Sequence, residues 1–366
     1  MSRRSLNYCP SAGHWTLCAA AIVLALLVVP AIRAWELRSF DGRDHVSMNE
    51  VADFYGLAER PGNSPGAKTF SGNGRELTVA TNSRQIVING IAHWLAFPVE
   101  QADGKLFLCR LDLGKTLEPA FRPERVAGFP PATTVVLDAG HGGRDNGAHS
   151  QYQWEKNFAL DVTRRIRNEL QKAGVPVVLT RNSDSFVELA DRAAVASRLK
   201  DAIFVSIHFN ATDANRDANG FEIYCVTPRG APSTAYEQLS ERDMVGENGN
   251  EHDLHSFALA NTIYHSMHGR MKMTDRGVKR ARFAVLRQAG VPAVLIEGGF
   301  LTNPGDALKI ASRPWRDDYA ASIARGILEY RNLVAHRIPP RQVDDYRHGR
   351  GPAAPAAPAP VAGSPD

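Results

Sequence analysis

The sequence has few cysteines and almost no excess of charge. Its 366 residues include only four cysteines, Cys9, Cys18, Cys109 and Cys225. These are too few and too scattered for a disulfide framework or a cysteine-ligated zinc finger. Lysine and arginine number 43 against 39 acidic residues, which gives a formal net charge of +4. This balance argues against a nucleic-acid-binding protein, because such proteins attract phosphates with a marked excess of positive charge.

Acidic residues are absent from the first 34 positions, which contain Arg3, Arg4 and Arg33. The rest of the chain therefore has 40 basic and 39 acidic residues and is nearly neutral. An uncharged apolar run, Leu17–Val29, follows the two leading arginines. Together with the small residues that follow it, this run predicts a secretory signal peptide over residues 1–34.

The signal is expected to be cut after Ala34, but an uncleaved N-terminal membrane anchor is the alternative. The uncharged stretch extends back to Ser5, which gives it more length than its apolar core alone. Both interpretations place the body of the protein outside the cytoplasm, in the periplasm or cell envelope. We interpret Cys109 and Cys225, which fall in different predicted domains, as buried small apolar residues.

Composition divides the rest of the chain into three zones. Residues 35–125 mix short strand-like runs with turns, which predicts a small α+β domain. Residues 132–335 alternate strands and helices and are predicted to form the catalytic domain. Residues 337–366 hold seven of the 22 prolines and are predicted to be a disordered tail. In the first zone we expect a helix over 47–57, strands over 76–80, 85–89 and 106–109, and a hairpin turn at Asn89-Gly90.

The catalytic zone has the pattern of an α/β fold. Its apolar strand-like runs are separated by amphipathic helices, which predicts a mainly parallel twisted sheet with helices on both faces. We expect strands over 134–137, 175–179, 202–207, 221–226, 283–286 and 293–296, helices over 154–173 and 189–199, and a late helix capped by Asn303.

Four polar residues lie at or beside the carboxyl ends of these strands, where open parallel sheets bind ligands. His141 follows the first strand in a glycine-rich turn, and His208 follows the third strand. Glu155 opens the first helix on its apolar side and is expected to point inward. Two imidazoles and one carboxylate are a typical ligand set for catalytic zinc, with one position left open. Glu297, at the end of the last strand, is then the expected base for the attacking water.

Each of these residues also has a purely structural interpretation. His141 can be a turn residue, His208 a core histidine, Glu155 a helix-terminus charge and Glu297 the partner of an arginine. Taken together, four such groups at the strand ends of one sheet favour a site. A phosphate-binding loop is excluded at residues 140–147, because no Gly-Lys-Ser/Thr follows the glycines and the spacing of a dinucleotide-binding motif is absent.

These motifs, taken in order, resemble the zinc-dependent N-acetylmuramoyl-L-alanine amidases over residues 133–333. The resemblance rests on residues 138–148, Glu155-Lys156-Asn157, Thr180-Arg181, Arg192, residues 206–211 and residues 297–303. It implies that His141, Glu155 and His208 bind Zn²⁺, that Glu297 is catalytic, and that the substrate is peptidoglycan. The implied reaction hydrolyses the amide between N-acetylmuramic acid and L-alanine of the stem peptide.

Four further residues receive substrate-binding or supporting roles. Asp138 either orients a metal ligand or stabilises the turn. Asn210 either holds the strand-end loop or contacts the stem peptide. Arg181 and Arg192 either bind substrate carboxylates or form salt bridges on helix surfaces. Surface salt bridges are the default expectation.

Two other segments carry weaker signals. Residues 35–125 faintly resemble the copper amine oxidase N-terminal-like module, and a generic small α+β domain is the equal alternative; no copper is expected there. The acidic stretch 227–256 is longer than a strand-to-helix connection needs. Some amidases of this family carry an insert here that blocks the zinc until an activator protein binds. The stretch 227–256 can act in the same way, with one of its acids reaching the metal. A solvated acidic loop is the favoured interpretation.

Two other functions remain open from the sequence. One is a non-catalytic cell-wall-binding protein, which the intact set of ligands and Glu297 disfavours. The other is a different zinc hydrolase acting on stem peptides, although the His-Glu-x-x-His helix of common metallopeptidases is absent.

Overall fold

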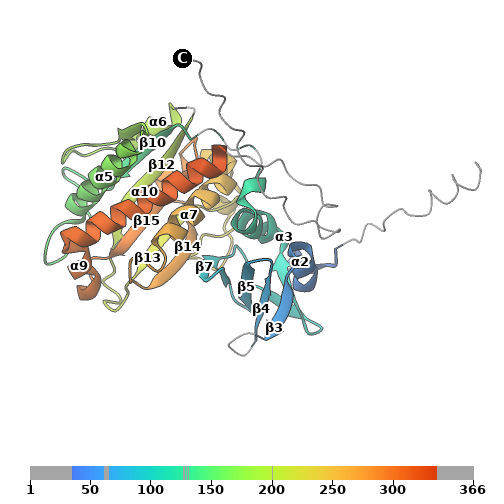
Figure 1. The fold of residues 1–366 in the computed structure, drawn as a ribbon. Helices are drawn as coiled ribbons and strands as arrows, with labels where there is room; N and C mark the ends of the chain where they lie inside the picture. Colours follow the sequence, from blue (N-terminus) through green and yellow to red (C-terminus); the bar gives the residue numbers. More distant parts are fainter. Residues whose placement is uncertain are drawn as a thin grey trace, which may run out of the picture. The chain divides into compact units, whose positions relative to one another are not determined.

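The computed structural model describes residues 35–335, apart from residues 62–65, 127, 129, 131 and 200 (Figure 1). The predicted signal peptide or anchor and the predicted tail therefore lie outside the described residues. By its internal contacts the chain divides into Met1–Glu36 and Leu37–Asp366, and every helix and strand of the described residues belongs to the second unit. None of the helices in the described part is both long and apolar enough to cross a membrane.

The N-terminal region begins with a four-stranded antiparallel sheet. Its order is β1 (Leu37–Phe40), β2 (Arg43–Ser47), β9 (Lys105–Cys109) and β8 (Glu100–Ala102). Helix α2 (Met48–Tyr55) packs against this sheet through its buried apolar side, and Gly56 ends the helix in a left-handed conformation. The predicted helix over 47–57 is thus confirmed, as is the strand over 106–109.

A second sheet has eleven strands and runs through both the N-terminal and the catalytic regions. Its order is β11-β10-β12-β15-β13-β14-β7-β6-β5-β4-β3. The strands are β3 (Ala58–Pro61), β4 (Ala67–Gly72), β5 (Arg75–Ala80), β6 (Gln85–Ile88), β7 (Ile91–Trp94), β10 (Thr134–Ala139), β11 (Val177–Leu179), β12 (Ala202–Asn210), β13 (Phe221–Val226), β14 (Asp275–Ala281) and β15 (Ala293–Phe300). The predicted turn at Asn89-Gly90 joins β6 to β7 with both residues at positive φ.

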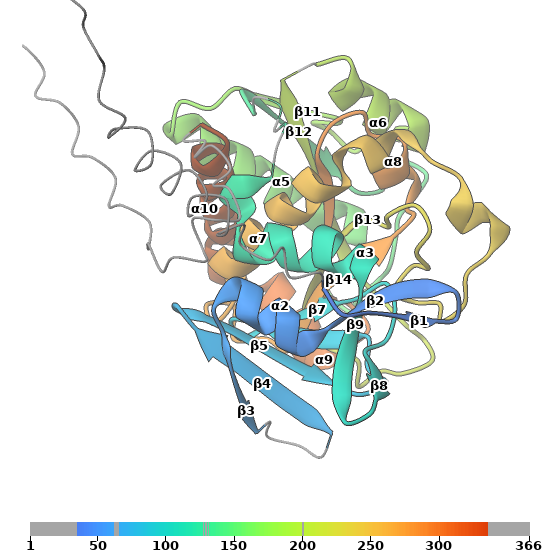
Figure 2. The same cartoon turned by 90° about the vertical axis from the view of Figure 1, so that its right-hand side faces the viewer.

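The catalytic part of this sheet is mainly parallel, as predicted. Strands β11, β10, β12 and β15 pair in parallel, and β13 pairs with β15 in antiparallel register. Helices α5 (Glu155–Lys172), α7 (Asp253–Met267) and α10 (Arg313–Ala335) pack together on one face, and α6 (Leu189–Ser197) and α8 (Ala284–Arg287) lie on the other (Figures 1 and 2). Helix α9 (Pro304–Ala311) follows β15, and Asn303 caps it by accepting two backbone hydrogen bonds.

Short helical turns complete the chain. They are α3 (Arg110–Asp112), a π-helical turn (Leu113–Leu117), α4 (Glu118–Phe121) and 3₁₀ turns at Pro123–Arg125, Glu241–Met244 and Asn248–His252. Cys109 and Cys225 are free and buried, as expected.

One strand prediction was wrong. The predicted strand over 283–286 is absent: Phe283 is the N-cap of α8, residues 284–286 lie in that helix, and the strand in this part of the chain is β14. Strand β14 was not predicted because its buried residues include Lys279 and Arg280. Lys279 pairs with Glu222, and Arg280 donates to the carbonyl oxygens of Val226 and Lys115, partners that are all distant in the sequence. The Ala-Val-Leu-Arg run is too short for periodicity to distinguish a strand from a helix.

The two regions join where β7 pairs in parallel with β14, with His93 opposite Val278. His93 is fully buried, and its ring nitrogens contact the carbonyl oxygen of Ile91 at 2.9 Å and Oδ1 of Asn261 on α7 at 3.1 Å. The sheet is therefore continuous across the predicted domain boundary. The division into 35–125 and 132–335 stays a prediction about independent units.

We expect His93 to make this junction sensitive to acid. Burial lowers the pKa of His93 to about 4, whereas the unfolded chain has an ordinary histidine pKa of about 6.5. The unfolded state therefore takes up the proton first as the pH falls through 6.5. This should remove about 3 kcal/mol of stability by pH 4.

Urea unfolding of wild type, His93→Gln and His149→Gln at pH 7 and pH 4.5 measures this effect. His149 is exposed, so its variant should keep the wild-type pH dependence. The His93 variant should lose part of the decrease in stability that wild type shows between pH 7 and pH 4.5. An identical decrease in all three proteins would contradict the assignment.

Candidate metal centre

The site begins in the glycine-rich turn after β10. His141 has φ of 58°, a left-handed conformation that is uncommon outside glycine and frequent at functional sites. A Cβ on Gly140 would lie 2.4 Å from the His208 ring, and one on Gly147 would lie 2.6 Å from Oε2 of Glu155. Glycine at these two positions therefore lets the three side chains of the site approach one another.

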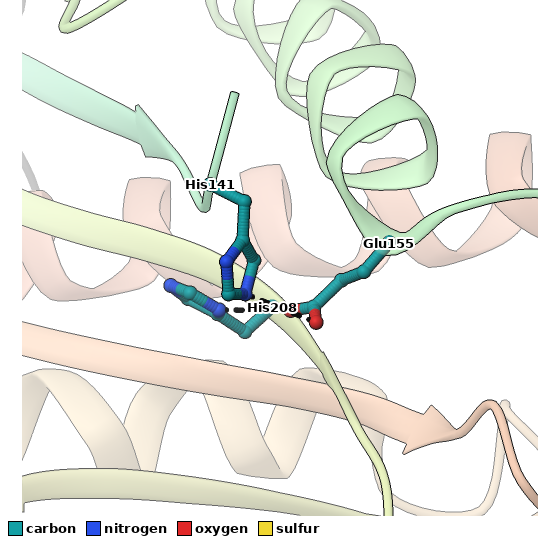
Figure 3. A group of neighbouring side chains, drawn as sticks. All are labelled: His141, Glu155 and His208. Carbon is teal, nitrogen blue, oxygen red and sulfur yellow. Dashed lines mark hydrogen bonds and ion pairs between the residues drawn. The ribbon is translucent and has the colours of Figure 1, made fainter. Parts of the chain in front are cut away.

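His141, Glu155 and His208 meet at the carboxyl ends of β10 and β12 and at the start of α5 (Figure 3). Nε2 of His141 lies 3.0 Å from Oε2 of Glu155, and Nδ1 of His208 lies 2.9 Å from Oε1. Among the described residues, this is the group of histidine, cysteine and acidic side chains whose donor atoms all lie within 4.8 Å of one another. The inward orientation expected for Glu155 is confirmed.

The electrostatics of this triad suit a cation. Burial by itself would raise the pKa of Glu155, but the hydrogen bonds and charges of the two histidines hold it well below its ordinary value. Burial lowers the pKa of His141, and its hydrogen bonds with Glu155 and Asp145 reverse this and raise it. The site therefore concentrates negative charge between two imidazoles. Two imidazoles and one carboxylate fit a divalent metal with an open coordination position.

Neighbouring groups fix the orientation of these side chains. Oδ2 of Asp145 lies 2.8 Å from Nδ1 of His141, which leaves Nε2 directed at Glu155. Glu155 also accepts hydrogen bonds from the backbone N–H groups of Ala148 and Phe209. Sequence reasoning assigned Asp145 no role, although it stands four residues after His141 in the same motif. A carboxylate that orients a metal-binding histidine is a common arrangement.

Glu297 lies on β15, next to the metal centre. Its register partners are His208 on β12 and Glu222 on β13. Oε2 of Glu297 is buried and accepts no hydrogen bond from the described residues. Burial, and then the charges of Glu155 and Glu222, raise the pKa of Glu297 well above its ordinary value. An unpartnered carboxylate beside the metal centre is available for proton transfer.

A cavity of about 440 Å³ opens onto this centre, and we call it the catalytic cavity. His141, His208 and Glu297 line one end of it. Residues 186–189, before and at the start of α6, and residues 283–285 in and before α8 form a largely apolar wall. The site therefore opens toward the face of the sheet that carries α6 and α8.

Asp138 and Arg192 form a buried ion pair, with 2.9 Å between Oδ1 and Nη1. Arg192 also donates to the carbonyl oxygens of Ala139 and His141, each at 2.7 Å. Arg181 donates to the carbonyl oxygens of Ala139 and Gly140. Both arginines are 3% exposed, so the default expectation of surface salt bridges was wrong. Asp138 and the two arginines instead fix the turn that carries His141.

Asn210 holds a different strand end. Its side-chain amide donates to Oε1 of Glu222 at 2.9 Å, and its own Oδ1 accepts from the backbone N–H of Ala211. Glu222 is buried and also accepts from Tyr224, Arg276 and Lys279. Asn210 was predicted either to hold the strand-end loop or to contact the stem peptide, and these contacts match the first of these two roles. Glu222 carried no sequence signal, because its cationic partners lie more than 50 positions away.

The acidic insert does not contribute a ligand to the metal centre. Asp243 pairs with Arg282, Glu247 with Arg287 and Asp253 with Lys115. None of residues 227–256, all of which are described, lines the catalytic cavity. The idea that an acid of the insert reaches the metal was therefore wrong for this conformation.

Comparisons with known proteins agree with this geometry. A family model described as Amidase_3, N-acetylmuramoyl-L-alanine amidase, matches residues 135–329. The chain is 29% identical over 280 residues to the N-acetylmuramoyl-L-alanine amidase AmiA of Escherichia coli (strain K12), covering 70% of this chain and 94% of that protein. It is 35% identical over 226 residues to the uncharacterized protein YqiI of Bacillus subtilis (strain 168), covering 62% and 95%.

The catalytic domain of CwlV, an N-acetylmuramoyl-L-alanine amidase from Bacillus (Paenibacillus) polymyxa var. colistinus, is 32% identical, with a TM-score of 0.46. The match covers 55% of this chain and 99% of that chain.

Proposed function

This chain belongs to the N-acetylmuramoyl-L-alanine amidase family, and we propose that it hydrolyses its substrate with a zinc ion held by His141, Glu155 and His208. It is an N-acetylmuramoyl-L-alanine amidase, and the family implies peptidoglycan as the substrate. The observation that supports the proposal is the meeting of the three donor atoms beside the unpartnered carboxylate of Glu297.

A bound zinc ion would polarise the scissile carbonyl and lower the pKa of a water molecule to about 7. Glu297 takes the proton of the attacking water and delivers it to the leaving amine of L-alanine. Asp145 keeps the His141 ring oriented toward Glu155, and the Asp138–Arg192 pair holds the backbone of the His141 turn. The side chains of Arg181, Arg192 and Asn210 are occupied by contacts within the protein, and we propose that they support the site rather than bind substrate.

Analysis of the products tests the reaction. Purified cell wall is incubated with wild type or with Glu297→Ala, and the released fragments are identified by mass spectrometry. Free stem peptides with an N-terminal alanine, from wild type alone, support the proposal. Release of sugars only, or cuts within the stem peptide, would contradict it and favour a different zinc hydrolase. No release at all would favour a wall-binding protein without activity.

The chain is homologous to cell-wall amidases, which are enzymes of the cell envelope. We propose that residues 1–34 direct export to the periplasm or cell surface and are removed after Ala34. Sequencing the N-terminus of the exported protein tests this. A mature chain that begins at Trp35 supports cleavage, and an intact N-terminus in the membrane fraction supports the anchor.

If residues 227–256 inhibited the enzyme until an activator protein displaced them, removing this insert would raise the activity. Since the insert does not line the catalytic cavity, we expect a variant lacking residues 228–250 to show no gain of activity on isolated cell wall. The measurement is the rate of stem-peptide release by equal amounts of metal-loaded protein. A several-fold increase over wild type would instead show that the insert is inhibitory.

A further inference from the structure

A second cavity of about 750 Å³ lies beside the catalytic cavity. Phe283 lines both of them. The Phe283 ring packs edge-on against Tyr224, with the ring centroids 5.0 Å apart. Tyr224 is two residues along β13 from Glu222, which lies opposite Glu297. Two residues of a strand span about 7 Å, so the second cavity begins within one or two residue lengths of the catalytic base.

The insert forms much of this cavity, and buried contacts hold it in place. Asp243 pairs with Arg282 at 2.6 Å and accepts hydrogen bonds from the backbone and hydroxyl groups of Ser240. Arg84, from the N-terminal region, donates to the carbonyl oxygens of Tyr236 and Pro232. The wall is therefore fixed by both the catalytic and the N-terminal regions, and the charges of Asp243 and Arg282 neutralise each other.

Two charges that line this cavity are available to a ligand. Glu237 and Arg242 are exposed, and within the described residues neither side chain makes a hydrogen bond or an ion pair. The exposed ring of Tyr236, next to Glu237, supplies an apolar surface. A carboxylate, a guanidinium and an aromatic ring suit a ligand with a short apolar stem that carries both an ammonium and a carboxylate.

We propose that the second cavity binds the side chain of the third residue of the stem peptide and selects diaminopimelate there. This inference rests on the proposed function. In a peptidoglycan stem, L-alanine and a γ-linked D-glutamate separate the scissile amide from a diamino acid. Two residues span about 7 Å, and the γ-linkage adds to this reach. Diaminopimelate ends in an ammonium and a carboxylate, whereas lysine ends in an ammonium alone.

Arg242 binds the terminal carboxylate, and Glu237 binds the ammonium. The two residues therefore differ in what they recognise. Arg242 distinguishes diaminopimelate from lysine, and Glu237 contributes to the binding of both. This gives the insert a role in substrate selection. It also gives the N-terminal region an indirect role, because Arg84 holds the loop that carries Tyr236 and Glu237.

The test uses the full metal-loaded chain and three soluble N-acetylmuramoyl tetrapeptides. Their third residues are diaminopimelate, diaminopimelate amidated at its free carboxyl, and lysine, each followed by D-alanine. The readout is kcat/KM for release of the peptide. We expect wild type to prefer diaminopimelate over the other two by roughly fivefold, the effect of one exposed charge pair.

Two variants separate the roles. Arg242→Gln should lower kcat/KM for diaminopimelate to the value for lysine and leave the other two substrates unchanged. Glu237→Gln should lower all three by a similar factor. The matched controls are Arg270→Gln and Glu241→Gln, whose exposed side chains lie outside the cavity lining, and both should behave as wild type. Arg242→Lys, which keeps the charge, should retain part of the preference.

Equal kcat/KM of wild type for the three substrates would overturn the inference and leave the amidase function intact. A loss in Arg242→Gln that is equal for all substrates would also overturn it. Failure of wild type to cut any of the three would count against the proposed function instead.

Discussion

Replacing Glu297 with glutamine is expected to lower the rate of stem-peptide release by at least about a thousandfold, while the protein keeps its bound metal. General acid–base catalysis contributes about 10²–10⁴ in rate, and in the proposed mechanism one carboxylate serves both proton transfers. Glutamine keeps the size and shape of the side chain but cannot carry a proton between water and the leaving amine. The measurements are turnover on purified cell wall and metal content after dialysis.

His141→Ala is the matched comparison, because it removes a ligand rather than the base. We expect this variant to lose both activity and bound metal. Equal metal content in the two variants would contradict the division of roles. The glutamine variant should also be at least as stable as wild type without metal, since it replaces a carboxyl whose ionised form is disfavoured by burial and by the charges of Glu155 and Glu222.

The metal centre could be predicted because its residues stand in local contexts with a clear physical meaning. His208 follows a run of apolar strand residues, Glu155 opens an amphipathic helix on its apolar side, and His141 sits in a glycine-rich turn. Parallel strands bring their carboxyl ends to one edge of the sheet, so these separate motifs had to converge. What remained open was which neighbouring groups orient them.

The supporting residues were harder to predict, because their partners are distant in sequence or are backbone atoms. Arg181 and Arg192 look like surface residues by composition, yet their donors bind carbonyl oxygens of the His141 turn. Lys279 made β14 look too polar for a central strand, although its charge pairs with Glu222. A buried charge is recognisable from sequence only when its partner is also known.

The eleven-stranded sheet crosses the boundary that the sequence predicted between the N-terminal and catalytic regions. Short strand-like runs predicted the strands over 76–80 and 85–89, but not that β7 would pair with β14. Strand pairing between distant segments leaves no local pattern, and the change in pattern between residues 35–125 and 132–335 suggested a boundary instead. Arg84 shows why the continuity matters, because it places a side chain of the N-terminal region against the insert beside the catalytic cavity.

The ion pair between Asp138 and Arg192 is expected to be the most costly support of the site to break. The two residues are 0% and 3% exposed. Ser206 and Thr180 also donate to Asp138, at 2.7 and 2.6 Å. Asp138→Ala leaves a buried guanidinium without its counter-charge, and we expect a loss of about 3–5 kcal/mol in the free energy of unfolding.

Urea unfolding of Asp138→Ala, Asp138→Asn and Glu169→Ala measures this effect. Asparagine keeps one of the two acceptor oxygens that Thr180 and Ser206 use, and it should cost less than alanine. Glu169 pairs with Lys172 on the exposed surface of α5, so its loss should change stability by no more than about 0.5 kcal/mol. Metal affinity should also fall in Asp138→Ala, because Arg192 donates to the carbonyl oxygen of His141. If Asp138→Ala unfolds and binds metal like the Glu169 variant, the pair does not hold the His141 turn, and the ligand geometry must depend on Arg181 and Asp145 alone.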